Sequence, residues 1–232
     1  MRKCIDMGEG REIIINDKDM LKPDGILEIP DIGLGEAYRG KASYVVYDEE
    51  DIDDDLLDLV YARKYNEPLV IARTERFIIR EMTVEDLPHL YELYQTLSDC
   101  PYVEPLYEYE DEKAFTIKYI ENMYGFFGYG LWLVLDKKTG ELVARAGIEN
   151  RSIDGQNCQE LGYLVKKSWQ GKHVAWEVMN HMVDIAKDRF GLEELYICTM
   201  KTNIPSIQLA LKLGFTLYAG DTDGMNIYRK FL

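Results

Sequence analysis

Apolar and polar residues change period near the middle of the chain, where a short strand pattern runs into a long helical one. Residues 161–165 read Leu-Gly-Tyr-Leu-Val, an apolar run of the length typical of strands. A basic bend follows over residues 166–173. Beyond it, apolar residues recur at the helical period and fall on one face: Val174, Val178, Met179, Met182, Val183, Ala186 and Phe190. This stretch predicts a strand, a bend and a helix that ends at Gly191.

The first 72 residues carry a different pattern, in which short apolar stretches alternate with glycine and proline. Strand-like stretches occur at residues 12–15, 26–29 and 42–47. An acidic run over residues 48–55 then precedes an apolar helical pattern, as carboxylates often do at the positive end of a helix. The run lacks the central glycine and final glutamate of a calcium loop, so we interpret it as a helix start or a solvated face. We expect a small β-rich unit over residues 1–72 that ends in a helix.

The rest of the chain, residues 73–232, alternates strand and helix patterns. Thr83 and Asp86 resemble a helix capping box. The expected elements, in order, are extended chain over 69–80, helices after Thr83 and over 110–124, hairpin strands at 129–135 and 141–149, the strand and helix described above, a strand at 194–199, a helix at 203–214, and strands at 215–219 and 225–231. This order of strands and helices predicts an α+β domain.

Composition narrows the class of partner. The chain has 232 residues, of which 47% are hydrophobic, as in folded globular proteins. Its net charge of −15 argues against nucleic acid as a partner, because phosphate binding needs clustered Lys and Arg. A cationic amine fits this field better, although acidity by itself also keeps a protein soluble.

The cysteines and the hydrophobic runs bear on cofactors and compartment. Cys4, Cys100, Cys158 and Cys198 lack the short paired spacing of zinc sites and redox motifs, so we expect no metal and reduced thiols. The first ten residues contain no apolar run of the signal-peptide kind, and no stretch is long and apolar enough to cross a bilayer. These features predict a cytoplasmic protein with no membrane partner.

Three different motifs, each present once, together indicate one family by their spacing along the chain. The basic bend ends Gln-Gly-Lys-His-Val-Ala at residues 170–175 and opens into a helix, where free backbone N–H groups favour a phosphate. A later helix begins Asn-Ile-Pro-Ser at residue 203 and closes with Leu-Gly-Phe at residues 213–215. Residues 74–80 read Thr-Glu-Arg-Phe-Ile-Ile-Arg. These motifs resemble, in turn, the pyrophosphate loop, the Asn-x-x-Ser helix and the first strand of GNAT acetyl-CoA-dependent N-acetyltransferases, in the branch that acetylates ribosomal-protein N-termini.

The resemblance implies a GNAT-like bent, mostly antiparallel sheet that is flanked by helices and splays at its fourth core strand, with acetyl-CoA in the splay as co-substrate. It implies these cofactor-binding residues: the backbone of Leu164, Val165 and Lys166 along the pantetheine arm, the loop of Gln170, Gly171, Lys172, His173, Val174 and Ala175 with its N–H groups at the pyrophosphate, and Asn203 and Ser206 on the following helix. His173 stands where the family usually has glycine. It is either a tolerated substitution or a contact to a phosphate.

Acetyl transfer also needs catalytic groups besides those that bind the cofactor. Acetyl transfer to an amine needs a base for the amine, a polarised thioester carbonyl and a proton for the leaving thiolate. The resemblance makes Glu160 the first candidate for the general base and Glu149, on the neighbouring strand, the second, although each could be a solvated carboxylate. Many relatives take the general acid from a tyrosine in the segment that corresponds to residues 208–212, which contains none here.

The acceptor is expected to be a primary amine, of a small molecule or of a protein N-terminus. Tyr102, Glu104 and Tyr107 are the candidate substrate-binding residues, because interleaved aromatics and carboxylates suit a cationic amine. They are also compatible with ordinary loop packing. The alternative function is that of a non-catalytic module that binds acyl-CoA or acts in regulation or protein interaction. The sequence is also compatible with a homodimer.

Overall fold

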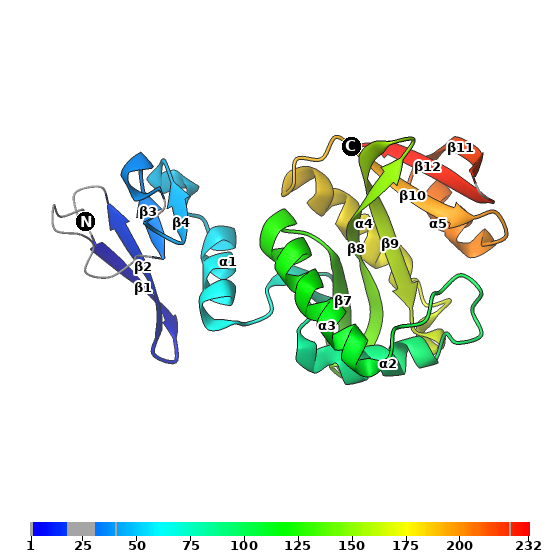
Figure 1. The fold of residues 1–232 in the computed structure, drawn as a ribbon, viewed down its shortest axis with the longest axis horizontal. Helices are drawn as coiled ribbons and strands as arrows, with labels where there is room; N and C mark the ends of the chain where they lie inside the picture. The colour runs from blue at the N-terminus through cyan, green and yellow to red at the C-terminus, as the bar shows by residue number, and fades with distance from the viewer. Residues whose placement is uncertain (1, 18–30, 40, 223) are drawn as a thin grey trace. The chain divides into compact units, whose positions relative to one another are not determined.

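The computed structural model describes residues 2–17, 31–39, 41–222 and 224–232, which form two compact units (Figure 1). The division falls between Leu69 and Val70. The boundary expected from the sequence, after Ala72, lies inside strand β5 (Val70–Arg73). Each unit has its own sheet.

The N-terminal unit is a small sheet with one α-helix. In the described residues its strands lie in chain order: β1 (Arg2–Gly8), β2 (Arg11–Asp17), β3 (Ile32–Leu34) and β4 (Tyr44–Val46). Strands β1 and β2 are antiparallel, whereas β2, β3 and β4 run parallel. The short helices η2 (Glu36–Tyr38) and η3 (Glu49–Asp51) precede α1 (Asp54–Tyr65). The core consists of Ile13, Ile15, Ile32 and Val60.

The predicted β-rich unit and the helix start are confirmed, with two corrections. Asp53 accepts a hydrogen bond from the Leu56 backbone N–H at 2.8 Å, so the acidic run caps a helix. The prediction missed strand β1. It also missed strand β3, because Gly33 and Gly35 made this segment resemble a turn. Strand β3 forms because Ile32 is buried beside Ile15, a pairing that no local pattern reveals. The expected strand at 26–29 lies outside the described residues.

The C-terminal unit is built on one sheet with the strand order β11-β12-β10-β9-β8-β7-β6-β5. Neighbouring strands are antiparallel except β9 and β10, which are parallel. The strands after β5 are β6 (Phe77–Arg80), β7 (Leu131–Asp136), β8 (Leu142–Ile153), β9 (Gln156–Val165), β10 (Glu194–Met200), β11 (Thr216–Thr222) and β12 (Met225–Phe231). The predicted mostly antiparallel sheet is confirmed.

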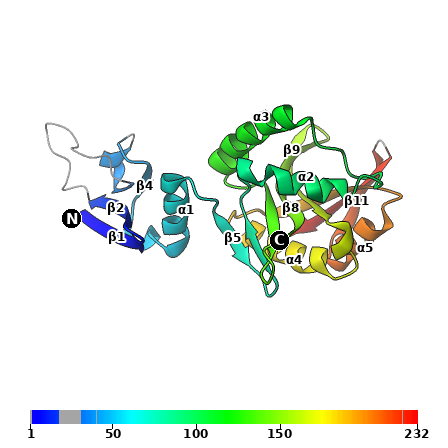
Figure 2. The same ribbon diagram turned by 90° about the horizontal axis from the view of Figure 1, so that it is seen from below.

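Helices cover both faces of this sheet. Figure 2 shows α3 on one side of β8 and β9, and α4 and α5 on the other. The helices are η4 (Val84–Asp86), α2 (Leu87–Gln95), α3 (Tyr109–Tyr119), η5 (Ile120–Phe127), η6 (Lys167–Trp169), α4 (Val174–Asp188) and α5 (Ile204–Lys212). The capping box of Thr83 and Asp86 is present. The helix expected over 110–124 is α3 continued by the π-helical turns of η5.

The extended chain expected over residues 69–80 is instead a hairpin of β5 and β6. Its turn is fixed from a distant element. The carboxylate of Glu177 on α4 accepts hydrogen bonds from Thr74 Oγ1 at 2.6 Å and from the Arg76 backbone N–H at 3.1 Å. A contact between positions 103 residues apart has no local signature, which explains why the sequence did not predict this turn.

Candidate active site

The sheet opens between β9 and β10. Strand β9 pairs with β8 along its whole length, from Ala144↔Val165 to Ile153↔Gln156. With β10 it pairs at one position within these described strands, Glu160↔Tyr196. Past Glu160 the β10 side of β9 therefore presents backbone groups to a gap, as expected for a splay at the fourth core strand.

A cleft of about 690 Å³ occupies this gap and continues to the N-terminus of α4. Nine of the eleven residues predicted to bind the cofactor line it: Leu164, Val165, Gln170, Gly171, His173, Val174, Ala175, Asn203 and Ser206. The fold brings these residues together, because β9, the loop before α4 and α5 all border the same cleft. The cleft can hold an elongated ligand with an anionic end.

The anionic end fits the loop before α4. Gly171 has φ 73° and His173, at the N-cap, has φ 60° and ψ 18°. Within the described residues no side chain caps this helix, so the first N–H groups of α4 are available to a ligand. Gln170 Nε2 donates to the Val165 carbonyl at 3.0 Å and ties the loop to the end of β9.

His173 adopts the left-handed conformation in which glycine is favoured, as its place in the motif suggested. We expect His173→Gly to stay within about 1 kcal/mol of the wild-type free energy of unfolding, and His173→Val to lose about 1–2 kcal/mol, because a β-branched side chain fits this region poorly. Urea denaturation followed by tryptophan fluorescence measures both. Equal stability of the two variants would contradict a left-handed residue 173.

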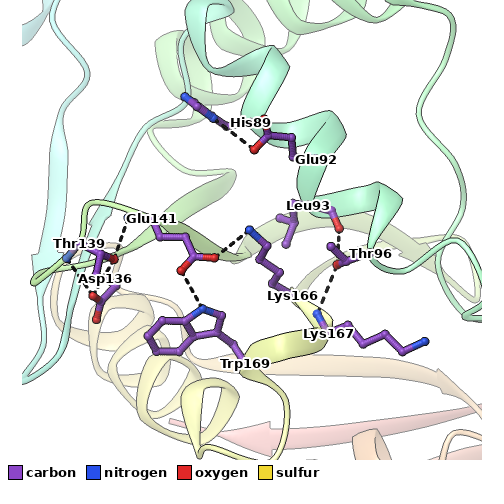
Figure 3. Close-up of polar contacts among 10 residues, drawn as sticks. All are labelled: His89, Glu92, Leu93, Thr96, Asp136, Thr139, Glu141, Lys166, Lys167 and Trp169. Carbon is purple, nitrogen blue, oxygen red and sulfur yellow. Dashed lines mark hydrogen bonds and ion pairs between the residues drawn. The ribbon is translucent and has the colours of Figure 1, made fainter.

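The other two predicted cofactor residues, Lys166 and Lys172, were expected to act through their backbone groups and are not among the described residues that line the cleft. The Lys166 N–H donates to the Val143 carbonyl at 2.8 Å. Lys172 Nζ lies 5.1 Å from the centre of the Trp169 ring. Lys166 Nζ donates to Glu141 Oε1 at 2.8 Å, and Trp169 Nε1 donates to Glu141 Oε2 at 3.2 Å (Figure 3). These donors hold the pKa of Glu141 below its usual value, the Lys166 contact contributing most. Glu141, immediately before β8, thus anchors both ends of the turn between β9 and the anion loop.

We expect Glu141→Ala to weaken acetyl-CoA binding by about threefold to tenfold with kcat nearly unchanged. The lost contacts are partly exposed, which limits their contribution to about 1 kcal/mol. Titration calorimetry with acetyl-CoA measures the affinity. Glu193→Ala, an exposed carboxylate on the same unit, is the matched control, and equal affinities of the two variants would remove Glu141 from this role.

The sequence missed several residues that line the cleft. Tyr163 on β9 and Trp169 on η6 belong to this group. Trp176 and Lys212 form the rim, with Lys212 Nζ 4.8 Å from the centre of the Trp176 ring. A large aromatic off the apolar stripe in the first turn of a helix was the available signal for Trp176. For Lys212 the sequence offered none.

Glu160 is held by two partners. Its side chain, 16% exposed, accepts from Arg151 Nη1 at 2.8 Å and from the Cys198 backbone N–H at 3.2 Å. The carboxylate therefore joins β9 to β8 and to β10 at the point where the sheet begins to open. Both oxygens of the Glu160 carboxylate are therefore engaged by protein donors.

Glu149 lies opposite Glu160 in the β8–β9 ladder but in a different environment. Burial raises the pKa of its carboxyl above the ordinary value, while the hydrogen bond from Tyr119 and the charge of Arg145 act the other way. The Tyr119 hydroxyl donates to Glu149 Oε1 at 3.0 Å and accepts from the Leu131 N–H at 2.7 Å. Glu149 is thus a fixed, half-buried carboxylate suited to take a proton.

The three predicted substrate residues do not gather at one point. Tyr102 lines the cleft and is 38% exposed. Glu104 lies in the exposed loop before α3. Tyr107 stacks edge-on against Phe115 with ring centres 5.8 Å apart, and Phe115 lies 5.9 Å from Tyr119. Of the three, Tyr107 therefore connects to Glu149 through a row of aromatic rings.

The described residues were expected to hold neither a metal cluster nor a membrane-spanning helix. Over residues 2–17, 31–39, 41–222 and 224–232, His, Cys, Asp and Glu side chains do not gather in groups of three or more as a metal site needs. Every helix in the same ranges is too short or too polar to cross a lipid bilayer.

Comparison with known proteins gives one family. A family model described as "Acetyltransferase (GNAT) domain" matches residues 76–216. YkkB of Bacillus subtilis is 28% identical over 144 residues, which are 61% of this chain and 82% of YkkB. A GnaT-family acetyltransferase from Bordetella pertussis has a TM-score of 0.60 at 20% identity, covering 68% of this chain and 98% of that one.

A second solved structure has a similar fold. The ribosomal-protein-S5-alanine acetyltransferase from Vibrio fischeri has a TM-score of 0.58 at 16% identity, covering 69% of this chain and 95% of that one. At these identities the structural matches establish a shared fold.

Proposed function

Because the chain belongs to the GNAT family of acetyltransferases, we propose that it moves the acetyl group of acetyl-CoA to a primary amine, of a small molecule or of a protein N-terminus. Membership of this family supports the activity of an acyl-CoA-dependent acetyltransferase. The observation that carries the proposal is the cleft that joins the opened edge of β9 to the bare N-terminus of α4.

The cleft suggests how acetyl-CoA would bind. The N–H groups at the start of α4, around Val174 and Ala175, suit the pyrophosphate. The edge of β9 at Leu164 and Val165, which does not pair with β10, suits the amides of the pantetheine arm, in the manner of an added strand. Asn203 and Ser206 line the same cleft from α5. The side chains of Lys166 and Lys172 contribute through the turn that they stabilise.

We assign the general base to Glu149 rather than Glu160. Burial raises the pKa of the Glu149 carboxyl, which makes it a better proton acceptor than an ordinary glutamate. Glu160 is engaged by Arg151 and by the Cys198 N–H. In this assignment Glu160 closes the apex of the opening, and Glu149 takes the proton of the attacking amine, directly or through a water.

The face of α3 that leads to Glu149 suits a cationic acceptor. Its first turn carries the exposed carboxylates Glu110 and Asp111, whereas Glu112 is buried and accepts a hydrogen bond from the Tyr107 N–H. The aromatic row from Tyr107 through Phe115 to Tyr119 leads to the Glu149 carboxylate. Aromatic faces and carboxylates attract ammonium groups, and the net charge of −15 acts in the same direction.

The test combines binding with turnover. Titration calorimetry with acetyl-CoA comes first, and a thiol-release assay on a panel of amines and N-terminal peptides follows. We expect micromolar binding and turnover that is fastest for cationic amines. Absence of binding would reject the proposal, and binding without turnover on any amine would favour a non-catalytic acyl-CoA-binding module.

A further inference from the structure

Tyr163 lies on β9 between the apex of the opening and the anion loop, and its side chain lines the cleft. Its hydroxyl lies 2.9 Å from Ser206 Oγ in the first turn of α5. This hydrogen bond joins two walls of the cleft and fixes the position of the phenol. Tyr163 is three residues from Glu160, about 10 Å along the strand.

The phenol and the base candidates lie on opposite faces of the sheet. Strands β8 and β9 pair without a register shift, so side chains alternate regularly along β9. Tyr163 and Glu160, three positions apart, therefore point to opposite faces. Glu149 is paired with Glu160 and shares its face. A thioester in the opening would have a carboxylate on one side and a phenol on the other.

Other proton-bearing side chains that line the cleft are placed less well. His173 belongs to the anion loop, and Lys212 stacks on Trp176 at the rim. Tyr102 is 38% exposed and comes from the loop after α2. Tyr163 differs from all three because it is half-buried on the rigid strand and oriented by a partner.

We propose that Tyr163 is the general acid of the acetyl transfer, donating its hydroxyl proton to the sulfur of acetyl-CoA as the C–S bond breaks. This inference rests on the proposed function. The amine nitrogen forms the new bond to the carbonyl carbon, and its proton passes to Glu149. The sulfur leaves with the electron pair of the C–S bond and takes the Tyr163 proton, and solvent then reprotonates the phenolate. The products are the amide and free CoA thiol.

The protonation state agrees with this role. Burial raises the pKa of Tyr163 above its ordinary value, and the hydrogen bond with Ser206 offsets part of that rise. The phenol is therefore protonated at neutral pH, as a proton donor must be.

The test is Tyr163→Phe, which removes only the hydroxyl. We expect kcat to fall about 10- to 30-fold with KM for acetyl-CoA within about twofold. The fall is smaller than many general-acid effects because a thiol of pKa about 8.5 is already a good leaving group. The solvent deuterium isotope effect on kcat should fall as well, since one proton in flight is lost. Tyr228→Phe is the matched control, because Tyr228 on β12 is buried, is not among the residues that line the cleft, and its hydroxyl accepts a hydrogen bond from the Asn226 side chain at 3.3 Å.

Three results decide the matter. An unchanged kcat in Tyr163→Phe, or a raised KM with kcat unchanged, would overturn the inference and leave the phenol as a wall of the cleft. A lowered kcat with an unchanged isotope effect would also overturn it, because a merely structural role predicts that pattern. A wild-type protein that acetylates no amine refutes the proposed function instead. Calorimetry with acetyl-CoA verifies that the variant still folds and binds.

Discussion

Glu149→Gln is expected to lower kcat for amine acetylation by about 10²- to 10³-fold, with acetyl-CoA affinity within about twofold of the wild type. Glutamine has the shape of the carboxylate and keeps an acceptor for the Tyr119 hydroxyl, but it cannot take a proton. The loss therefore reports proton transfer alone. Thiol release under saturating acetyl-CoA and amine measures kcat, and calorimetry measures the affinity.

The same substitution has a signed effect on stability. A carboxyl whose folded pKa lies above its unfolded pKa binds more protons when folded, so stability falls as pH rises from the unfolded to the folded pKa. Above that window Glu149 destabilises the fold. Glu149→Gln should thus be more stable than the wild type at neutral pH and lose this advantage at low pH. Wild-type kcat should rise with pH through the raised pKa of Glu149.

Glu160→Gln is the matched comparison. It removes the charge that pairs with Arg151, so we expect lower stability and a loss in kcat of less than about fivefold. If Glu160→Gln abolishes turnover and Glu149→Gln does not, the two assignments must be exchanged.

Most of the cleft-lining residues predicted from the sequence belong to features that a single continuous segment forms. A glycine-containing turn that opens into a helix places N–H groups at one point because helix geometry requires it. Asn203 caps α5 by accepting from the Ser206 N–H at 3.4 Å, which is again a local arrangement. Where one segment builds the feature, spacing along the chain is sufficient to find it.

The roles of the carboxylates depend on distant segments. Glu149 and Glu160 look alike in sequence, and what separates them is Tyr119, thirty residues away on α3, and Arg151 on the neighbouring strand. The Lys166 side chain is held by Glu141, 25 residues earlier in the chain on the β7–β8 hairpin. Tertiary contacts of this kind decide pKa and orientation, and no periodicity encodes them.

Gly147→Ala is expected to destabilise the C-terminal unit by about 3 kcal/mol, at the upper end of overpacking effects. A Cβ at Gly147 would lie 1.9 Å from the Gly130 carbonyl oxygen, and this oxygen accepts the Ile148 N–H at 3.1 Å. Backbone cannot yield as a side chain can, so β7 must move away from β8. Denaturation followed by tryptophan fluorescence reports this unit, since all three tryptophans belong to it.

Gly162→Ala is the control, because Gly162 is the ladder partner of Gly147 and its added Cβ would meet only the Leu131 side chain, at 3.3 Å. We expect a loss of less than about 1 kcal/mol there. The difference between the two glycines bears on catalysis, since Leu131 supplies the N–H that orients Tyr119 and Glu149 lies two residues beyond Gly147. Gly147→Ala should therefore lose activity even where it remains folded. Equal stability of the two variants would mean that β7 and β8 do not approach this closely.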